Sequence, residues 1–173
     1  MIVVVMGVAG SGKTTVATML ADAMRCPFLE GDSLHPASNV EKMSRGIPLT
    51  NADRAPWLAA IHPRLLDAFE RQQSLVVACS ALTQSSRTIL AEGIPINWVY
   101  LKGDTTLIRS RLQHRPGHFM KAEMLASQLK ALEEPTDAIT ADVSMPPSAI
   151  VEGVLAELDG QIDVDGTSSA PTR

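Results

Sequence analysis

The sequence predicts an α/β fold of three layers, in which helices cover both faces of a five-stranded parallel sheet. Short apolar runs alternate with helical patterns along the chain of 173 residues, as expected for parallel strands joined by crossover helices. The length suits a single domain. We predict one domain over residues 1–159 and a disordered tail over 160–173, where Gly, Ser, Thr, Asp and Pro dominate.

Apolar runs and turn residues place the individual elements. Continuous apolar runs of this kind are typical of interior parallel strands, and we expect the third strand to lie beside the first. Asn51 is the expected N-cap of a long helix, and Asp104 is the expected N-cap of a later helix. The expected strands cover residues 2–6, 27–30, 74–82, 97–101 and 139–143, and the expected helices begin near residues 15, 36, 51, 83, 104, 122 and 148.

Composition narrows the class of partner and the compartment. The net charge is −4 and the pI about 5.5, so the surface as a whole does not attract a nucleic-acid backbone, and a small anion bound locally is the expected partner. Cys26 and Cys79 lack metal-ligand spacing and are expected to be buried free thiols in a reducing cytosol. No apolar run is long enough to span a bilayer. We therefore expect a cytoplasmic protein without a membrane partner.

A glycine-rich loop directly follows the first apolar run. Residues 7–14 read G-x-x-x-x-G-K-T, the pattern of a P-loop, whose backbone N–H groups cradle phosphate at a helix N-terminus. Lys13 can reach the β- and γ-phosphates as a catalytic cation, and the Thr14 hydroxyl can ligate Mg²⁺. The alternative is a glycine turn without a ligand. The expected nucleotide-binding residues are Gly7, Val8, Ala9, Gly10, Ser11, Gly12, Lys13, Thr14 and Thr15.

Candidate residues for the phosphoryl acceptor follow the second and third strands. Asp32 lies at a strand end, where ligands of parallel sheets bind, and its carboxylate could accept a proton. The alternative is that Asp32 only caps the next helix, a task that Ser33 could also perform. Arg54 lies in the first turn of a helix, where a cation is unfavourable unless it binds an anion; a solvated surface arginine is the alternative. The third strand ends in Cys79 and Ser80 rather than in an aspartate, which favours small-molecule kinases over GTPases and motor ATPases. Ser80 is a candidate to hold a metal-bound water or an acceptor hydroxyl.

Arginines are concentrated on the helix that begins near Asp104. Arg111 and Arg115 are four residues apart and so share one helix face, where they could clamp phosphate and stack on a base. The alternative is an ordinary solvated helix face. The segment after them, residues 115–121, combines a glycine with flanking cations and is expected to form a mobile lid.

Together these segments resemble the gluconokinase family. The resemblance covers about residues 2–158, and Gly-Asp-x-Leu-His-Pro and Pro-Gly-His-Phe are its most specific motifs. It implies a P-loop kinase fold with a mobile lid, use of ATP and Mg²⁺, and phosphorylation of D-gluconate to 6-phospho-D-gluconate, which feeds sugar-acid catabolism and the pentose phosphate pathway. Family members are often homodimers. The motifs that carry the resemblance lie at residues 6–14, 30–36, 39–43, 46–49, 53–58, 79–82, 100–103 and 115–119.

The resemblance also implies roles for individual residues. Asp32 is the base on the acceptor side, and wider similarity to nucleoside-monophosphate and shikimate kinases implies Arg111 near the adenine and Arg115 as a catalytic cation near the phosphates. The expected substrate-binding residues are Asp32, His35, Arg54, Ser80 and His118. Two alternatives remain: another small carboxylate such as shikimate as acceptor, or a nucleotide-binding switch, although the Asn-Lys-x-Asp element of guanine-specific switches does not occur.

Overall fold

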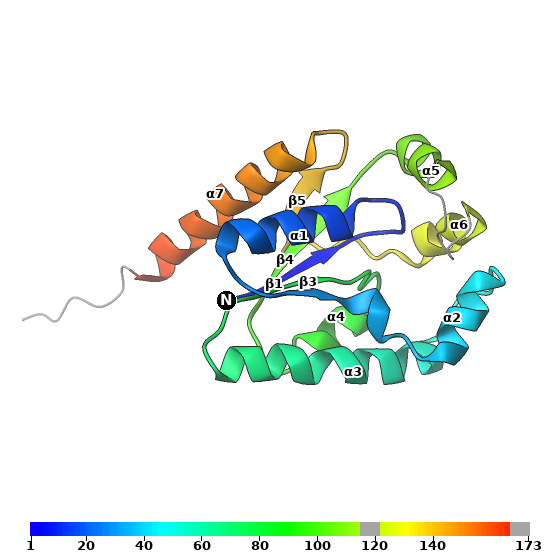
Figure 1. The fold of residues 1–173 in the computed structure, drawn as a ribbon, viewed down its shortest axis with the longest axis horizontal. Coiled ribbons are helices and arrows are strands. Elements are labelled where there is room, and N and C mark those ends of the chain that lie inside the picture. Colours follow the sequence, from blue (N-terminus) through cyan, green and yellow to red (C-terminus); the bar gives the residue numbers. More distant parts are fainter. Residues whose placement is uncertain (115–121, 167–173) are drawn as a thin grey trace, which may run out of the picture.

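The computed structural model describes residues 1–114 and 122–166, and its strands form one parallel sheet (Figure 1). The strand order is β2-β3-β1-β4-β5, and each neighbouring pair runs parallel. The predicted parallel sheet, including the place of β3 beside β1, is therefore confirmed. The strands are β1 (Ile2–Met6), β2 (Phe28–Glu30), β3 (Leu75–Ala78), β4 (Ile96–Lys102) and β5 (Ile139–Asp142).

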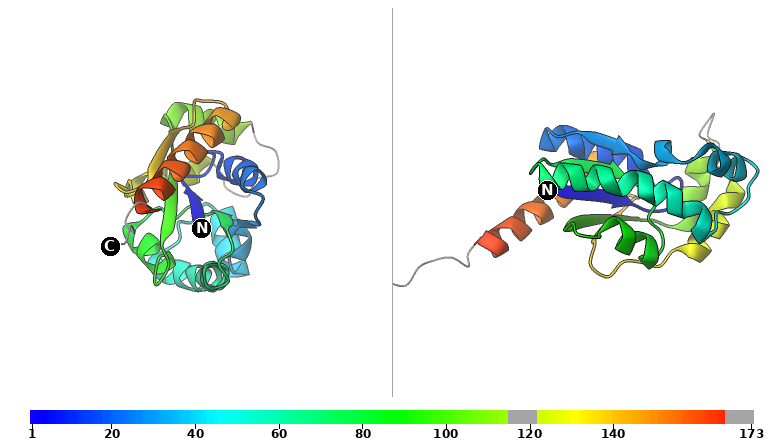
Figure 2. Two further views of the ribbon diagram at one scale, coloured as in Figure 1. Left: turned by 90° about the vertical axis from the view of Figure 1, so that its left-hand side faces the viewer. Right: turned by 90° about the horizontal axis from the view of Figure 1, so that it is seen from below.

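Helices cover both faces of this sheet, so the three-layer prediction is also confirmed. Helices α1 and α7 lie together on one face and α3 and α4 on the other (Figures 1 and 2). Helices α2, α5 and α6 gather at the end of the molecule away from the N-terminus. The helices are α1 (Lys13–Met24), the 3₁₀ helix η1 (Gly31–Leu34), α2 (Ala37–Ser44), α3 (Asn51–Glu70), α4 (Gln84–Leu90), α5 (Thr105–Gln113), α6 (Ala122–Ala131) and α7 (Pro147–Gly166).

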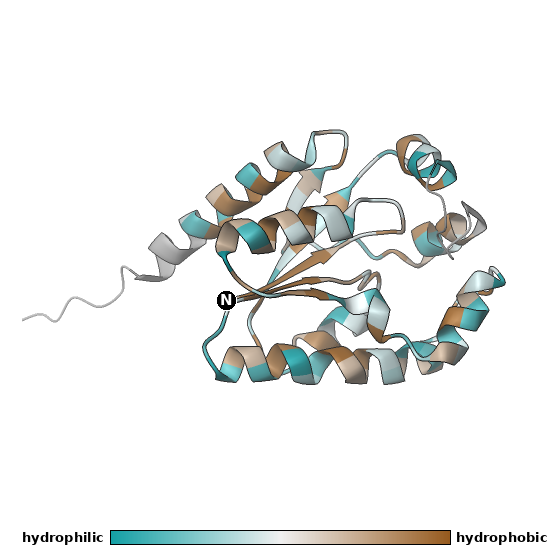
Figure 3. Ribbon diagram, viewed as in Figure 1, coloured by the Kyte–Doolittle hydropathy of each residue, from teal (hydrophilic) through white to brown (hydrophobic). Residues whose placement is uncertain are grey.

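Strand β1 lies at the centre of the sheet and is completely buried. Its alternating side chains contribute to two separate cores: Val3 and Val5 pack with α1 and α7, while Ile2, Val4 and Met6 pack with α3 and α4. Figure 3 shows the corresponding pattern, with largely hydrophobic central strands between helices along which hydrophobic and hydrophilic residues alternate. The strand before the glycine-rich loop is thus fixed on both sides.

Local features that differ from the sequence prediction include the N-cap of α3, the end of β3 and the burial of Cys26. The N-cap of α3 is Thr50 rather than Asn51, because the Thr50 hydroxyl accepts a hydrogen bond from the Asp53 N–H and the Asp53 carboxylate accepts one from the Thr50 N–H. Strand β3 ends at Ala78, before the chain turns at Ala81 with a φ of 41°. Cys79 is buried as expected, whereas Cys26 is only half-buried.

Helix α7 continues past Gly160 to Gly166, into the range where the sequence predicted a disordered tail. A glycine inside a helix costs only about 1 kcal/mol relative to alanine, so Gly160 does not end it. The rest of the predicted tail, residues 167–173, lies outside the described residues. None of the described helices is both long and apolar enough to cross a membrane.

Candidate active site

The glycine-rich loop connects β1 to the N-terminus of α1 at the centre of the sheet. Gly12 is the N-cap of α1 and has a left-handed φ of 95°, and Gly10 has a φ of 82°. At Gly10 a Cβ would also lie 2.7 Å from the Leu112 Cγ. Glycine is therefore required at both positions, and the positive end of α1 faces the loop, as a phosphate site needs.

Lys13 and Ser11 are buried polar residues of this loop. The Lys13 side chain is 7% exposed, and its ammonium donates a hydrogen bond to the Val8 carbonyl at 3.2 Å, which keeps the charge on the loop. The Ser11 Oγ is buried and has no hydrogen-bond partner among the described residues. Thr14 and Thr15 are exposed at the start of α1. The loop thus presents one buried cation and several hydroxyl groups at a helix N-terminus.

Glu30, at the end of β2, contacts the threonine that was predicted to bind metal. The Thr14 hydroxyl donates to Glu30 Oε2 at 2.7 Å, and the Asp32 N–H donates to Glu30 Oε1 at 3.4 Å. Hydroxyl and carboxylate oxygens are the ligands that Mg²⁺ prefers, and Mg²⁺ needs few of them from the protein. Sequence reasoning missed Glu30 as a site residue, although an acidic residue two positions before Asp32 at a strand end was a usable signal.

Asp32 lies in η1, which α3 holds in place. The Trp57 indole donates a hydrogen bond to the Gly31 carbonyl at 2.8 Å. Asp32 Oδ1 is buried, and no described residue donates a hydrogen bond to it. Burial raises the pKa of the nearby Cys79 thiol, and the charge of Asp32 raises that pKa further. Asp32 therefore lies near the end of β3, and the hydrogen-bonding capacity of its buried Oδ1 is not used by any described residue.

A cavity of about 430 Å³ adjoins this region and brings three predicted acceptor residues together: His35, Arg54 and Ser80 all line it. The His35 ring stacks on Trp57 with the ring centres 4.2 Å apart. Arg54 is half-buried, donates to the Asn51 side chain at 2.9 Å, and has its pKa lowered by burial. Apolar residues complete the wall, among them Met43, Leu49, Leu82 and Met124.

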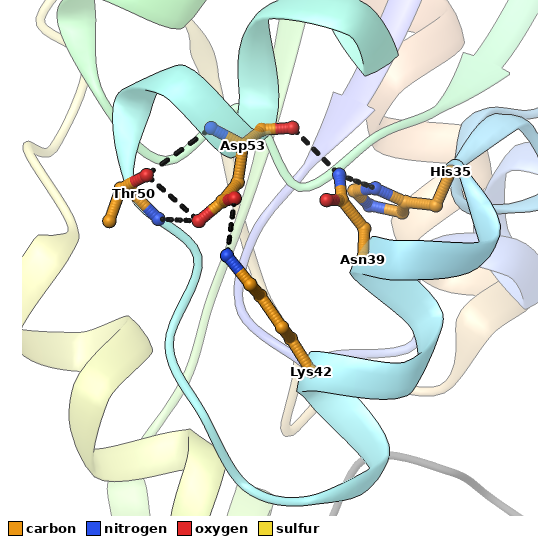
Figure 4. A network of polar contacts seen from close by, with 5 residues as sticks. All are labelled: His35, Asn39, Lys42, Thr50 and Asp53. Carbon is orange, nitrogen blue, oxygen red and sulfur yellow. Dashed lines mark hydrogen bonds and ion pairs between the residues drawn. The ribbon is translucent and has the colours of Figure 1, made fainter.

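A polar network joins α2 to the start of α3 beside this cavity (Figure 4). The Lys42 ammonium contacts the Asp53 carboxylate at 2.6 Å, and the same carboxylate accepts hydrogen bonds from Thr50. These contacts, Lys42 first, lower the pKa of Asp53 to about 2. Asn39, which is 2% exposed, donates to the Asp53 carbonyl at 2.7 Å. The network fixes α2 and His35 relative to the helix that carries Arg54.

The loop after β3 is held by a buried arginine. Arg87 is 4% exposed and donates to the Ala81 carbonyl at 3.1 Å and to the Leu82 carbonyl at 3.3 Å. Ala81 has the positive φ that non-glycine residues rarely adopt, so these bonds stabilise an unfavourable turn. They also position Ser80, which precedes it in the cavity wall. The sequence offered no signal for Arg87.

Helix α6 contacts the glycine-rich loop through Gln128. Its Oε1 accepts a hydrogen bond from the Ala9 N–H at 2.6 Å, and Gln128 also lines the cavity. This contact links the predicted phosphate site to the cavity. A glutamine within a helix gives no sequence signal of such a role.

The remaining predicted residues lie on or after α5. The Arg111 guanidinium donates to the Val143 carbonyl at 2.8 Å, so it lies against the end of β5. Its place near the adenine stays a prediction. Arg115, His118 and the predicted lid over residues 115–121 lie outside the described residues.

Comparison with known proteins gives consistent results over most of the chain. A family model described as an AAA domain matches residues 2–135. The chain is 43% identical to the thermoresistant gluconokinase of Escherichia coli K12 over 160 residues, which is 90% of this chain and 89% of that protein. It is 53% identical to a gluconokinase of Gluconobacter oxydans over 135 residues, or 78% and 76% of the two chains.

A solved structure agrees with these sequence matches. The crystal structure of a gluconokinase from Sinorhizobium meliloti 1021 superposes with a TM-score of 0.84 at 43% identity. The superposition covers 95% of this chain and 96% of that one. The likeness therefore extends to the whole fold around the candidate site.

Proposed function

The chain belongs to the gluconokinase family, and from this premise we propose that it transfers the γ-phosphoryl group of ATP to D-gluconate, forming 6-phospho-D-gluconate. The observation that carries the proposal is the 43% identity to the Escherichia coli enzyme over nine tenths of both chains. The acceptor cavity supports it, since His35, Arg54 and Ser80 offer hydrogen-bond donors and a positive charge to a polyhydroxy acid.

The proposed mechanism assigns a separate task to each group of residues. The glycine-rich loop and Lys13 bind the phosphates of ATP, and Arg54 binds the carboxylate of the acid, which aligns its hydroxyl for in-line attack. Asp32 accepts the hydroxyl proton on its carboxylate, whose Oδ1 has no hydrogen-bond donor among the described residues. Positioning and charge stabilisation thus account for most of the proposed catalysis.

We further propose that Thr14 and Glu30 hold Mg²⁺. The Thr14 hydroxyl and the Glu30 carboxylate lie 2.7 Å apart at the helix N-terminus, and both are oxygen donors that fit this ion. When bound with ATP, Mg²⁺ neutralises charge on the β- and γ-phosphates. A homodimer and a cytoplasmic location are also proposals that follow from the family.

Replacing Glu30 by glutamine is expected to raise the Mg²⁺ concentration needed for half-maximal activity by about 10- to 100-fold, the usual effect of losing a partner around a metal. The variant keeps the shape of the side chain but loses its charge. Direct binding of Mn²⁺ in the presence of ATP, followed by electron paramagnetic resonance, should weaken in parallel. Glu70→Gln, at the exposed end of α3, is the matched control. An unchanged metal requirement in Glu30→Gln would remove Glu30 from the proposed site.

Replacing Arg54 by alanine is expected to raise the KM for the acid by roughly 10- to 100-fold, because one charge-assisted hydrogen bond contributes about 1.5 to 3 kcal/mol. The KM for ATP should stay the same. Arg54→Lys should recover little if the contact is bidentate, since an ammonium lacks the planar fork. Arg45→Ala, on the exposed surface after α2, is the control. An equal rise in both KM values would contradict a role confined to the acid.

The choice of acceptor is tested by a steady-state screen of gluconate, related sugar acids and shikimate with ATP and Mg²⁺. We expect gluconate to give the highest kcat/KM. Strong turnover of shikimate or another acid without turnover of gluconate would contradict the proposed substrate while leaving the kinase chemistry in place.

A further inference from the structure

The protonation state of His35 can be read from the contacts of its neighbour Asn39. The Asn39 Nδ2 lies 2.7 Å from the Asp53 carbonyl oxygen and 3.3 Å from the His35 Nδ1 (Figure 4). A backbone carbonyl oxygen can only accept a hydrogen bond. The group that faces it must therefore be the NH₂ of the Asn39 amide, and this settles which way the amide is turned.

The same NH₂ group faces the imidazole. An amide nitrogen donates and does not accept hydrogen bonds, so the His35 Nδ1 must be the acceptor and cannot carry a proton. We propose that Asn39 holds His35 as a neutral imidazole with its proton on Nε2, so that His35 offers the cavity a hydrogen-bond donor without a positive charge. Asn39 acts through His35 and is thus a positioning residue.

The surroundings of both residues support this assignment. Asn39 is buried, and the Asp53 carbonyl that orients it belongs to a residue fixed by Lys42 and by the Thr50 capping contacts. Trp57 stacks on the imidazole with the rings 14° from parallel, which restricts its rotation.

The charges around His35 agree with a neutral ring. Burial is the largest effect and lowers its pKa; the charge of Arg54 lowers it further, while that of Asp32 acts in the opposite direction. The net shift is downward, so the ring loses its proton more readily than an exposed histidine.

This state defines what His35 can do in the proposed reaction, and this step rests on the proposed function. Its Nε2–H can donate to a carboxylate or hydroxyl oxygen of the acid. Its lone pair on Nδ1 is occupied by Asn39, so His35 cannot take the proton of the reacting hydroxyl. The neutral, Nε2-protonated ring therefore leaves Asp32 as the base and makes His35 a residue that recognises the acid.

The tautomer can be measured directly by long-range proton–nitrogen correlation NMR of the uniformly labelled protein at neutral pH. The chain has four histidines, and the signals lost in His35→Gln identify those of His35. We expect a neutral ring with its proton on Nε2. A proton on Nδ1, or on both nitrogens, would overturn the proposal. This readout needs no substrate and stands even if the protein does not phosphorylate gluconate.

Variants of Asn39 test whether it imposes this state. In Asn39→Asp a carboxylate, which accepts hydrogen bonds, faces Nδ1. We therefore expect a proton on the His35 Nδ1, either in the other neutral tautomer or in the imidazolium. In Asn39→Leu, which serves if the aspartate variant does not fold, the two tautomers should interconvert. Asn97→Asp is the matched control, because it makes the same charge change far from the cavity, where the Asn97 amide donates to the Ile2 carbonyl at 3.2 Å. This variant should leave the His35 tautomer unaltered.

Kinetics of the same variants link the tautomer to the acid. We expect the KM for gluconate to rise about tenfold, the effect of one lost hydrogen bond, with the KM for ATP unchanged. A His35 tautomer that stays on Nε2 in both Asn39 variants, or an altered tautomer with an unchanged KM for gluconate, would overturn the role of Asn39. Absence of gluconate turnover in the unmodified protein would count against the proposed function alone.

Discussion

Replacing Lys13 by alanine is expected to lower the turnover number by about 10² to 10⁴, the range found when an electrostatic stabiliser of a transition state is removed. The ammonium lies on the glycine-rich loop itself, 3.2 Å from the Val8 carbonyl, and is almost fully buried. In this position its charge opposes the negative charge that develops on the transferred phosphoryl group. An ATP-coupled assay at saturating gluconate measures the loss.

Arg71→Ala is a suitable control for Lys13→Ala, because the side chain of this exposed arginine forms a surface ion pair with Asp67, and such pairs contribute little to stability. Thermal unfolding of both variants would separate loss of catalysis from loss of fold. Turnover of Lys13→Ala close to that of the unmodified protein would mean that the phosphates bind elsewhere.

Asp32→Asn is expected to lower the turnover number by about 10² or more, because the amide keeps the size of the carboxylate but cannot accept the hydroxyl proton. The affinity for ATP should hardly change, since the glycine-rich loop is intact. Single-turnover kinetics with saturating ATP and gluconate would measure the chemical step directly.

The matched control for this variant is Asp22→Asn, on the exposed side of α1. Normal turnover by Asp32→Asn would show that Asp32 only binds or caps. Proton removal would then fall to water or to the phosphate itself, since the Nδ1 of His35 faces Asn39.

The fold was largely predictable because its signals are local. An apolar strand, a glycine loop and a helix follow one another at the N-terminus, and residues 2–6 are all buried as this order requires. The errors arose where two local signals compete. Thr50 and Asn51 can both cap a helix, and the contacts of Asp53 with Thr50 decide between them. The composition after Gly160 suggested that the last helix ends there. A helix can accommodate a glycine, however, and α7 continues to Gly166.

The candidate site was predictable only in part, because its supporting contacts join residues far apart in sequence. His35, Arg54 and Ser80 lie close to the predicted start or end of a strand or helix, and they line one cavity. The contacts of Asn39 with Asp53, of Arg87 with Ala81 and of Gln128 with Ala9 depend on how separate elements pack. No periodicity or motif encodes such contacts, so they emerge only from the folded structure.

The most direct test of the proposed phosphoryl transfer uses gluconate labelled with carbon-13 at its sixth carbon, incubated with the protein, ATP and Mg²⁺ and observed by NMR. We expect the labelled carbon signal to split through coupling to phosphorus while the γ-phosphate signal of ATP disappears. Release of ADP without this splitting, or an unchanged spectrum under conditions where another acid is phosphorylated, would contradict transfer to the 6-hydroxyl of gluconate.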